Sequence, residues 1–128
     1  MKVLLDTQAF LWWISDADRL TPRARAVIAD PGSEVLVSVA SAWEIAIKSA
    51  TGRLELEGPA ETYVPDRIRQ HGFGVLPVEL GHALRAGTLP RHHGDPFDRL
   101  LVAQGQVEDV PIITADPLLN LYDVETIW

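Results

Sequence analysis

Short apolar runs alternate with segments of helical periodicity along the whole chain, and this alternation limits the possible folds more than any other feature. The runs that predict strands are residues 3–5, 35–39, 75–78, 111–114 and 124–127. The segments that predict helices are 7–14, 22–29, 41–50, 65–70, 81–86 and 96–107, while 54–63 stay ambiguous. Continuous apolar strands that alternate with helices are typical of a parallel sheet covered on both faces. We therefore expect an α/β fold with a mostly parallel four- or five-stranded sheet flanked by helices.

Size and composition predict one folded domain spanning residues 1–128. Hydrophobic residues make up 47% and charged residues 23% of the chain, and no linker, repeat or low-complexity segment interrupts it. The absence of cysteine excludes disulfides, thiolate chemistry and cysteine–zinc sites. The start of the chain has no signal-peptide pattern, and no apolar run is long enough to cross a bilayer. We expect a cytoplasmic protein that does not contact membranes.

The net charge argues against a protein that coats nucleic acid. Eleven basic and 18 acidic residues give a formal charge of −7, whereas such proteins are normally basic. An excess of acids is compatible with an enzyme that gathers a metal cation, and with a basic protein partner.

Acidic residues stand where the predicted strands and helices meet. Asp6 follows the first strand, and Asp116 follows the fourth strand. Glu44 lies early in the helix after the second strand, and Asp98 opens the helix before the fourth. Ligands of open α/β sheets bind beyond the carboxyl ends of the strands, so we expect these acids to converge there.

Each of these acids also has a purely structural explanation. Asp6 and Asp116 are each placed to cap a following helical turn, and Ser41 with Glu44 matches a capping box. Asp95 precedes a proline, as an N-cap residue often does. For any one residue alone, capping is the better explanation.

Taken together, the four acids favour a metal site. Carboxylates that share one site repel each other, and a divalent cation removes that cost. We predict that Asp6, Glu44, Asp98 and Asp116 bind Mg²⁺ or Mn²⁺. Such a site suits phosphodiester hydrolysis by a metal-activated water, with Asp6 and Asp116 as the main ligands. The serines lack evident histidine and acid partners, which argues against a serine hydrolase.

At these positions the sequence resembles PIN-domain ribonucleases and, among them, VapC-type toxins. The matching segments occur in the family's order and cover essentially the whole chain; they are residues 3–7 (VLLDT), 38–45 (SVASAWEI), 95–104 (DPFDRLLVAQ) and 113–116 (ITAD). The resemblance implies that Asp6, Glu44, Asp98 and Asp116 are both the catalytic and the metal-binding residues. It also implies an endoribonuclease toxin that cuts RNA with Mg²⁺ or Mn²⁺. The expected partners are a second copy of the chain and a VapB-type antitoxin that inserts a peptide near the acids.

Several residues near the acids have less certain roles. We expect Asp95 to be a cap or a support for the site, and Thr7 and Thr114 to support the neighbouring acids. Arg99 is expected to form a surface ion pair, with RNA phosphate as the alternative partner.

Histidines and tryptophans of the chain also have two explanations each. We expect the loop 91–93 to be solvated, with phosphate contact as the alternative. Trp12, Trp13 and Trp43 are expected to pack in the core or in a dimer interface, with base stacking as the alternative.

Two other functions remain open. A receiver-like signalling domain also combines a parallel α/β sheet with an Mg²⁺-binding acidic pocket. Such domains carry paired acids after the first strand and a lysine after the last, whereas Asp6 stands alone and the only lysines are Lys2 and Lys48. The second alternative is an inactive PIN-like interaction module, against which the presence of all four acids argues.

Overall fold

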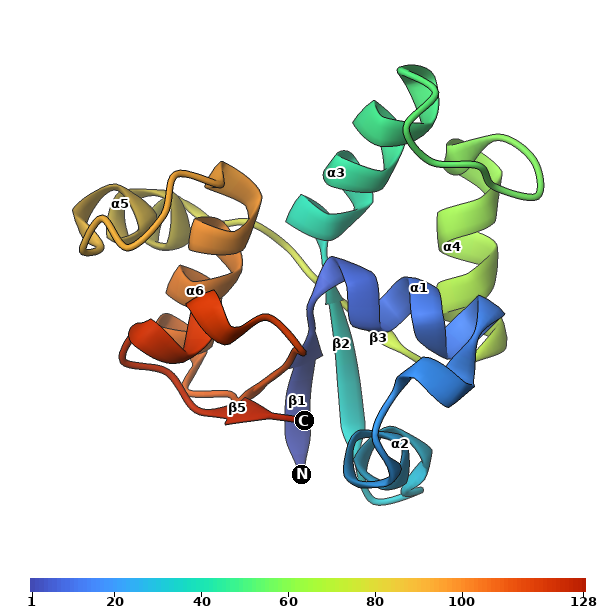
Figure 1. Cartoon of the computed structure of the whole chain (residues 1–128), viewed down its shortest axis with the longest axis horizontal. Coiled ribbons are helices and arrows are strands. Elements are labelled where there is room, and N and C mark those ends of the chain that lie inside the picture. Colours follow the sequence, from blue (N-terminus) through green and yellow to red (C-terminus); the bar gives the residue numbers. More distant parts are fainter.

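The computed structural model describes all residues, 1–128, and shows a five-stranded sheet in which every pair of neighbours is parallel. The strand order is β3-β2-β1-β4-β5 (Figure 1). The strands are β1 Lys2–Leu5, β2 Glu34–Ser38, β3 Gly74–Leu76, β4 Ile112–Ile113 and β5 Thr126–Ile127. The predicted fold class is therefore confirmed.

Six α-helices surround the sheet. They are α1 Thr7–Ser15, α2 Pro22–Ala29, α3 Val39–Ala50, α4 Ala60–Gln70, α5 Leu80–Thr88 and α6 Pro96–Glu108. Two short 3₁₀ helices, Ala17–Arg19 and Pro117–Leu121, complete the fold. None of these helices combines the length and the apolar character needed to cross a membrane.

Alternate residues of the central strand face two separate cores. Val3 and Leu5 of β1 pack in a cluster with side chains of α1, α2, α3 and α4. Leu4 points to the other face and packs in a second cluster with side chains of α6. In Figure 1 the two groups of helices lie on opposite sides of β1. This two-sided burial explains why the strands read as continuous apolar runs.

The strand order places a switch point beside β1. The chain builds outward from β1 through β2 to β3, then returns to pair β4 with the other side of β1. Asp6 directly follows β1, and residues 114–116 follow β4. A crevice beyond the carboxyl ends at such a reversal is the usual ligand site of open α/β sheets.

Helix α3 begins at Val39, two residues earlier than predicted. Ser38 is its N-cap, and the Ser38 hydroxyl accepts a hydrogen bond from the amide of Ala40 at 3.0 Å. Val39, predicted as the last strand residue, is the first residue of the helix. The predicted capping box of Ser41 and Glu44 is therefore wrong, because both residues lie inside the helix.

Prolines account for two more differences. Helix α4 begins at Ala60, within the ambiguous segment, and includes Pro65, which was predicted to open it. Pro65 lacks the amide that would bond to the preceding turn, but Tyr63 and Val64 are buried and hold the helix in place. Strand β3 ends at Leu76, directly before Pro77, rather than at residue 78.

Candidate functional site

A pocket of about 440 Å³ lies at the carboxyl edge of the sheet and brings together the four acids predicted from the sequence. Its acidic lining residues are Asp6, Glu44, Asp95, Asp98 and Asp116. Two basic residues, Lys48 and Arg53, line the same pocket. The expected convergence of the acids is thus present in the structure.

Asp6 is buried where β1 passes into α1. Its Oδ1 accepts a hydrogen bond from the amide of Ala9 at 2.7 Å, so the predicted helix cap is present. Burial, with a smaller contribution from the charges of Asp116 and Glu44, raises the pKa of Asp6 to about 6, although hydrogen bonds from Thr114 and Ala9 oppose the increase. Asp6 therefore caps α1 and also faces its acidic neighbours.

Glu44 projects from α3 and is only 5% exposed. The Thr7 hydroxyl donates to its Oε1 at 2.7 Å, and the Lys48 ammonium donates to its Oε2 at 2.6 Å. The Ser41 hydroxyl is in turn hydrogen-bonded to that of Thr7 at 2.9 Å. Both carboxylate oxygens of Glu44 are thus held by named donors.

Asp98 lies in the first turn of α6, whose N-cap is Asp95. The Asp95 carboxylate accepts hydrogen bonds from the amides of Phe97 at 2.9 Å and Asp98 at 3.3 Å, which confirms its capping role. Burial and then repulsion by Asp95 raise the pKa of Asp98 to about 6, while a hydrogen bond from His93 lowers it.

Asp116 is half-buried after β4 and caps the 3₁₀ helix that follows. Its Oδ1 accepts from the amide of Leu118 at 2.9 Å, so this predicted cap is also present. The amide of Asp116 donates to the Thr114 hydroxyl at 3.0 Å. Thr114 therefore contacts Asp116 directly and bonds to Asp6 as well.

The chemistry of these side chains fits a hard divalent cation. The acids offer only oxygen ligands, and the raised pKa of Asp6 and Asp98 reflects burial and mutual repulsion that a cation would relieve. As the side chains stand, no three of them are arranged closely enough to hold an ion. Glu44 is committed to Thr7 and Lys48, and it would have to release a partner in order to bind one.

The PIN domain family model matches residues 3–124. This chain belongs to the PIN domain family.

Known relatives agree with this assignment. Ribonuclease VapC16 of Mycobacterium tuberculosis is 45% identical over 58 residues, which is 45% of this chain and 41% of that protein. Ribonuclease VapC22 of the same organism is 28% identical over 121 residues, covering 92% of this chain and 89% of that protein. The solved structure of VapBC2 from Rickettsia felis, bound to a DNA fragment from its promoter, superposes with a TM-score of 0.73 and 10% identity. That match covers 100% of this chain and 99% of the other, and it shows a shared fold.

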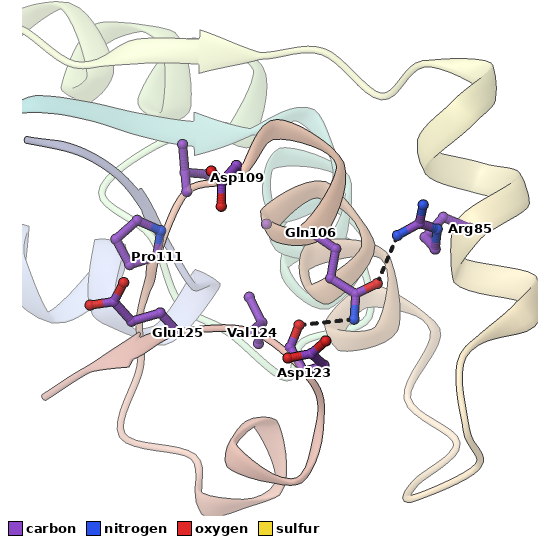
Figure 2. A pocket seen from close by; sticks show the side chains of 9 residues that line it. Arg85, Gln106, Asp109, Pro111, Asp123, Val124 and Glu125 are labelled. Atoms are coloured by element: carbon purple, nitrogen blue, oxygen red, sulfur yellow. Dashed lines mark hydrogen bonds between the residues drawn. The ribbon is translucent and has the colours of Figure 1, made fainter.

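A different pocket of this PIN domain, about 370 Å³, lies at the opposite edge of the sheet (Figure 2). It is lined by residues that precede β4 and β5, together with the end of α6 and Arg85 of α5. Gln106 bridges it by accepting from Arg85 and donating to the backbone of Asp123, both at 3.2 Å (Figure 2). None of the four predicted acids lines this pocket, so we place the candidate site at the carboxyl edge.

The contacts of two residues beside the site of this PIN domain differ from those predicted from the sequence. His93 was expected in a solvated loop, but its side chain is only 11% exposed and its Nε2 lies 3.4 Å from Oδ2 of Asp98. Arg99 was expected to pair with an acid, but it donates to the backbone carbonyls of Ala86, Leu89 and Pro90. Both contacts depend on how the loop folds back, which a local pattern does not specify.

Lys48 was not predicted to contribute to the site. Its spacing of four residues after Glu44 was the available signal, because such a pair meets on one helix face.

The tryptophans differ in their surroundings. Trp12 and Trp13 pack against the core as expected, whereas Trp43 is 60% exposed and meets the ring of Phe97 at 5.4 Å.

Proposed function

We propose that this PIN domain is a metal-dependent endoribonuclease and the toxin of a VapBC-type toxin–antitoxin pair. The observation that carries the proposal is that four acids from three separate helix starts and one helix interior line a single pocket at the switch point of the sheet. Two relatives are named ribonucleases, and one of them aligns over most of both chains.

Asp6, Glu44, Asp98 and Asp116 are the proposed ligands of Mg²⁺ or Mn²⁺. A bound divalent cation would lower the pKa of a water and neutralise the charge that develops on an RNA phosphate. The protein supplies fixed positions for the acids, because Asp6 and Asp116 are each held by a backbone amide at a helix start. A helix N-terminus also favours the ionised carboxylate that a cation requires.

Thr7 and Lys48 orient Glu44 before a cation binds, because each of them donates to a different carboxylate oxygen. In this proposal Glu44 releases the more exposed donor, Lys48, when it binds the cation, and Thr7 keeps it in place. Lys48 is 41% exposed and Arg53 lines the same pocket, so both are available to meet an RNA phosphate at its rim.

The test compares RNA cleavage by the wild type and by Asp6→Asn, with and without EDTA. Asparagine keeps the shape and can still cap the helix, but it removes a ligand charge. We expect a loss of cleavage of about 100-fold or more, since even residues that only support metal ligands cost roughly 10- to 100-fold. Cleavage products should carry 5′-phosphates. Undiminished cleavage by Asp6→Asn, or cleavage that survives EDTA, would contradict the mechanism, and 2′,3′-cyclic phosphate ends would show that the RNA's own hydroxyl attacked.

A VapB-type antitoxin is the proposed protein partner. The solved relative from Rickettsia felis is a VapBC assembly, and its fold matches this chain over its whole length. Co-expression with the product of an adjacent short reading frame should yield a stable complex with reduced RNA cleavage. Purification of the chain alone from such a co-expression would contradict this partner.

A further inference from the structure

A run of hydrogen bonds leads from the end of α5 to the candidate site. Its members, which we call the support chain, are Arg99, Tyr122, His93 and Asp98. Arg99 Nη1 lies 3.4 Å from the Tyr122 hydroxyl, and that hydroxyl lies 2.7 Å from His93 Nδ1. His93 Nε2 then lies 3.4 Å from Oδ2 of Asp98. The run therefore ends on one of the four proposed ligands.

One direction satisfies every donor and acceptor of the support chain when His93 is neutral. An arginine guanidinium can only donate, so the Tyr122 oxygen accepts from Arg99 and its own proton is free to point to His93 Nδ1. A neutral imidazole that accepts at one nitrogen donates from the other. In this arrangement the proton of His93 is on Nε2, where it faces Asp98.

The support chain is firmly held at its far end. Arg99 donates to the carbonyls of Ala86 and Leu89 at 3.0 Å each and of Pro90 at 2.8 Å. Tyr122 is 5% exposed and belongs to the core cluster of α6. The His92 ring packs edge-on against the Tyr122 ring, with 4.8 Å between centroids, but no hydrogen bond joins them. These contacts hold the Tyr122 hydroxyl in position independently of its hydrogen bond to His93.

We propose that His93 is a positioning residue for Asp98, and that Tyr122 sets the tautomer in which His93 does this. With Oδ2 of Asp98 held by His93, the other oxygen is left for a cation in the pocket. This inference rests on the proposed function, because Asp98 needs a fixed orientation only if it binds an ion. Supporting partners of this kind typically change metal affinity about 10- to 100-fold.

Manganese binding to the metal-free protein provides the primary test, measured by the electron paramagnetic resonance signal of free Mn²⁺. We expect His93→Ala to weaken binding by about 10-fold, and His93→Gln, which keeps an amide donor, to restore part of it. His92→Ala is the matched control, because it removes a neighbouring ring that packs on Tyr122 and donates nothing to Asp98. A purely structural role for His93 would lower the melting temperature and leave Mn²⁺ affinity unchanged.

Two further measurements distinguish positioning from general damage. Nitrogen-15 NMR of the histidine rings should show His93 protonated at Nε2 in the wild type and as a mixture of tautomers in Tyr122→Phe. In an Asp98→Asn background, His93→Ala should weaken Mn²⁺ binding no further, since both changes act through the same carboxylate.

The outcomes separate this inference from the function on which it rests. A wild type that binds Mn²⁺ and cuts RNA, with His93→Ala binding Mn²⁺ as tightly, would overturn the positioning role alone. Equal losses in His93→Ala and His92→Ala would overturn it as well. A wild type that binds no Mn²⁺ would overturn both proposals.

Discussion

At the scale of single residues, burial in the candidate site conflicts with the negative charge of its carboxylates. Burial and, to a smaller extent, acidic neighbours raise the pKa of Asp6 and of Asp98 to about 6. Hydrogen bonds from Thr114 and His93 oppose the shift without cancelling it. Sites where local interactions disfavour the folded state are typically functional, because a bound ligand supplies the missing stabilisation.

This conflict predicts that Asp6→Asn stabilises the metal-free protein at neutral pH. The pKa of Asp6 is about 6 in the folded chain against 3.8 for the ordinary group, so the folded state binds the proton more tightly. The free energy of unfolding therefore falls as pH rises from about 4 to about 6, and it stays lowered above that range. At pH 7.5 the variant should be more stable by up to ~3 kcal/mol, and the gain should shrink as the pH approaches 4.

Urea unfolding in EDTA at several pH values measures this gain. Asp123→Asn is the control, because Asp123 is exposed and lies outside the acidic pocket, and it should give no comparable gain in stability. A lower stability of Asp6→Asn than of the wild type at pH 7.5 would show that capping, rather than charge burial, dominates at this position.

At the scale of elements, periodicity predicted that α3 and α6 exist but not where α3 begins. The sequence around its start holds two serines, Ser38 and Ser41, and the capping-box spacing favours the second. The first is the cap because β2 runs only to residue 38 and the chain turns there. The consequence for the site is that Glu44 lies in the second helical turn, where Thr7 and Lys48 reach it. The sequence pattern of each helix by itself did not predict the tertiary contacts between α1 and α3.

The two serines give opposite predictions for stability. Ser38→Ala removes the cap, worth about 1 kcal/mol, and leaves the buried Gln104 Oε1 without the Ser38 hydroxyl as its donor, worth about 1–3 kcal/mol. Ser41→Ala removes only the hydrogen bond to Thr7, worth about 1 kcal/mol. Urea denaturation of both variants should rank Ser38→Ala as the more destabilised. The reverse ranking would indicate that Ser41, rather than Ser38, caps the helix.

At the scale of the whole molecule, the parallel sheet and the acids at its carboxyl edge were predictable, whereas the strand order and the surface were not. Alternating apolar runs identify strands, but nothing local specifies that β4 returns to the side of β1. The hydrogen bond between His93 and Tyr122, which are 29 residues apart in the sequence, also depends on this return of the chain to β1. Phe10 is buried in the chain's own core, and residues 11–14 pack against that core while staying partly exposed.

The two most exposed leucines of the chain lie on α5, and we propose this helix as the interface of the predicted dimer. His82 and Ala86 of this helix face inward, while Leu80 and Leu84 are 76% and 64% exposed on the outer face, one turn apart. A second copy of the chain that covers such a face would remove apolar area from water, which stabilises association by roughly 25 cal/mol per Å². Sedimentation at micromolar concentration should therefore show about twice the chain mass of 14.1 kDa.

Charges on this face should dissociate the dimer. Leu80→Glu combined with Leu84→Glu places two carboxylates at the predicted contact, and burying an unpaired charge is costly, so this variant should sediment as a monomer. Leu118→Glu combined with Leu121→Glu makes the same chemical change on the 3₁₀ helix, where the leucines are 39% and 55% exposed, and it should leave the dimer intact. Thermal melting of both variants checks that each is folded. If the wild type is a monomer throughout the micromolar range, or if both pairs of substitutions weaken association equally, the outer face of α5 is not the interface.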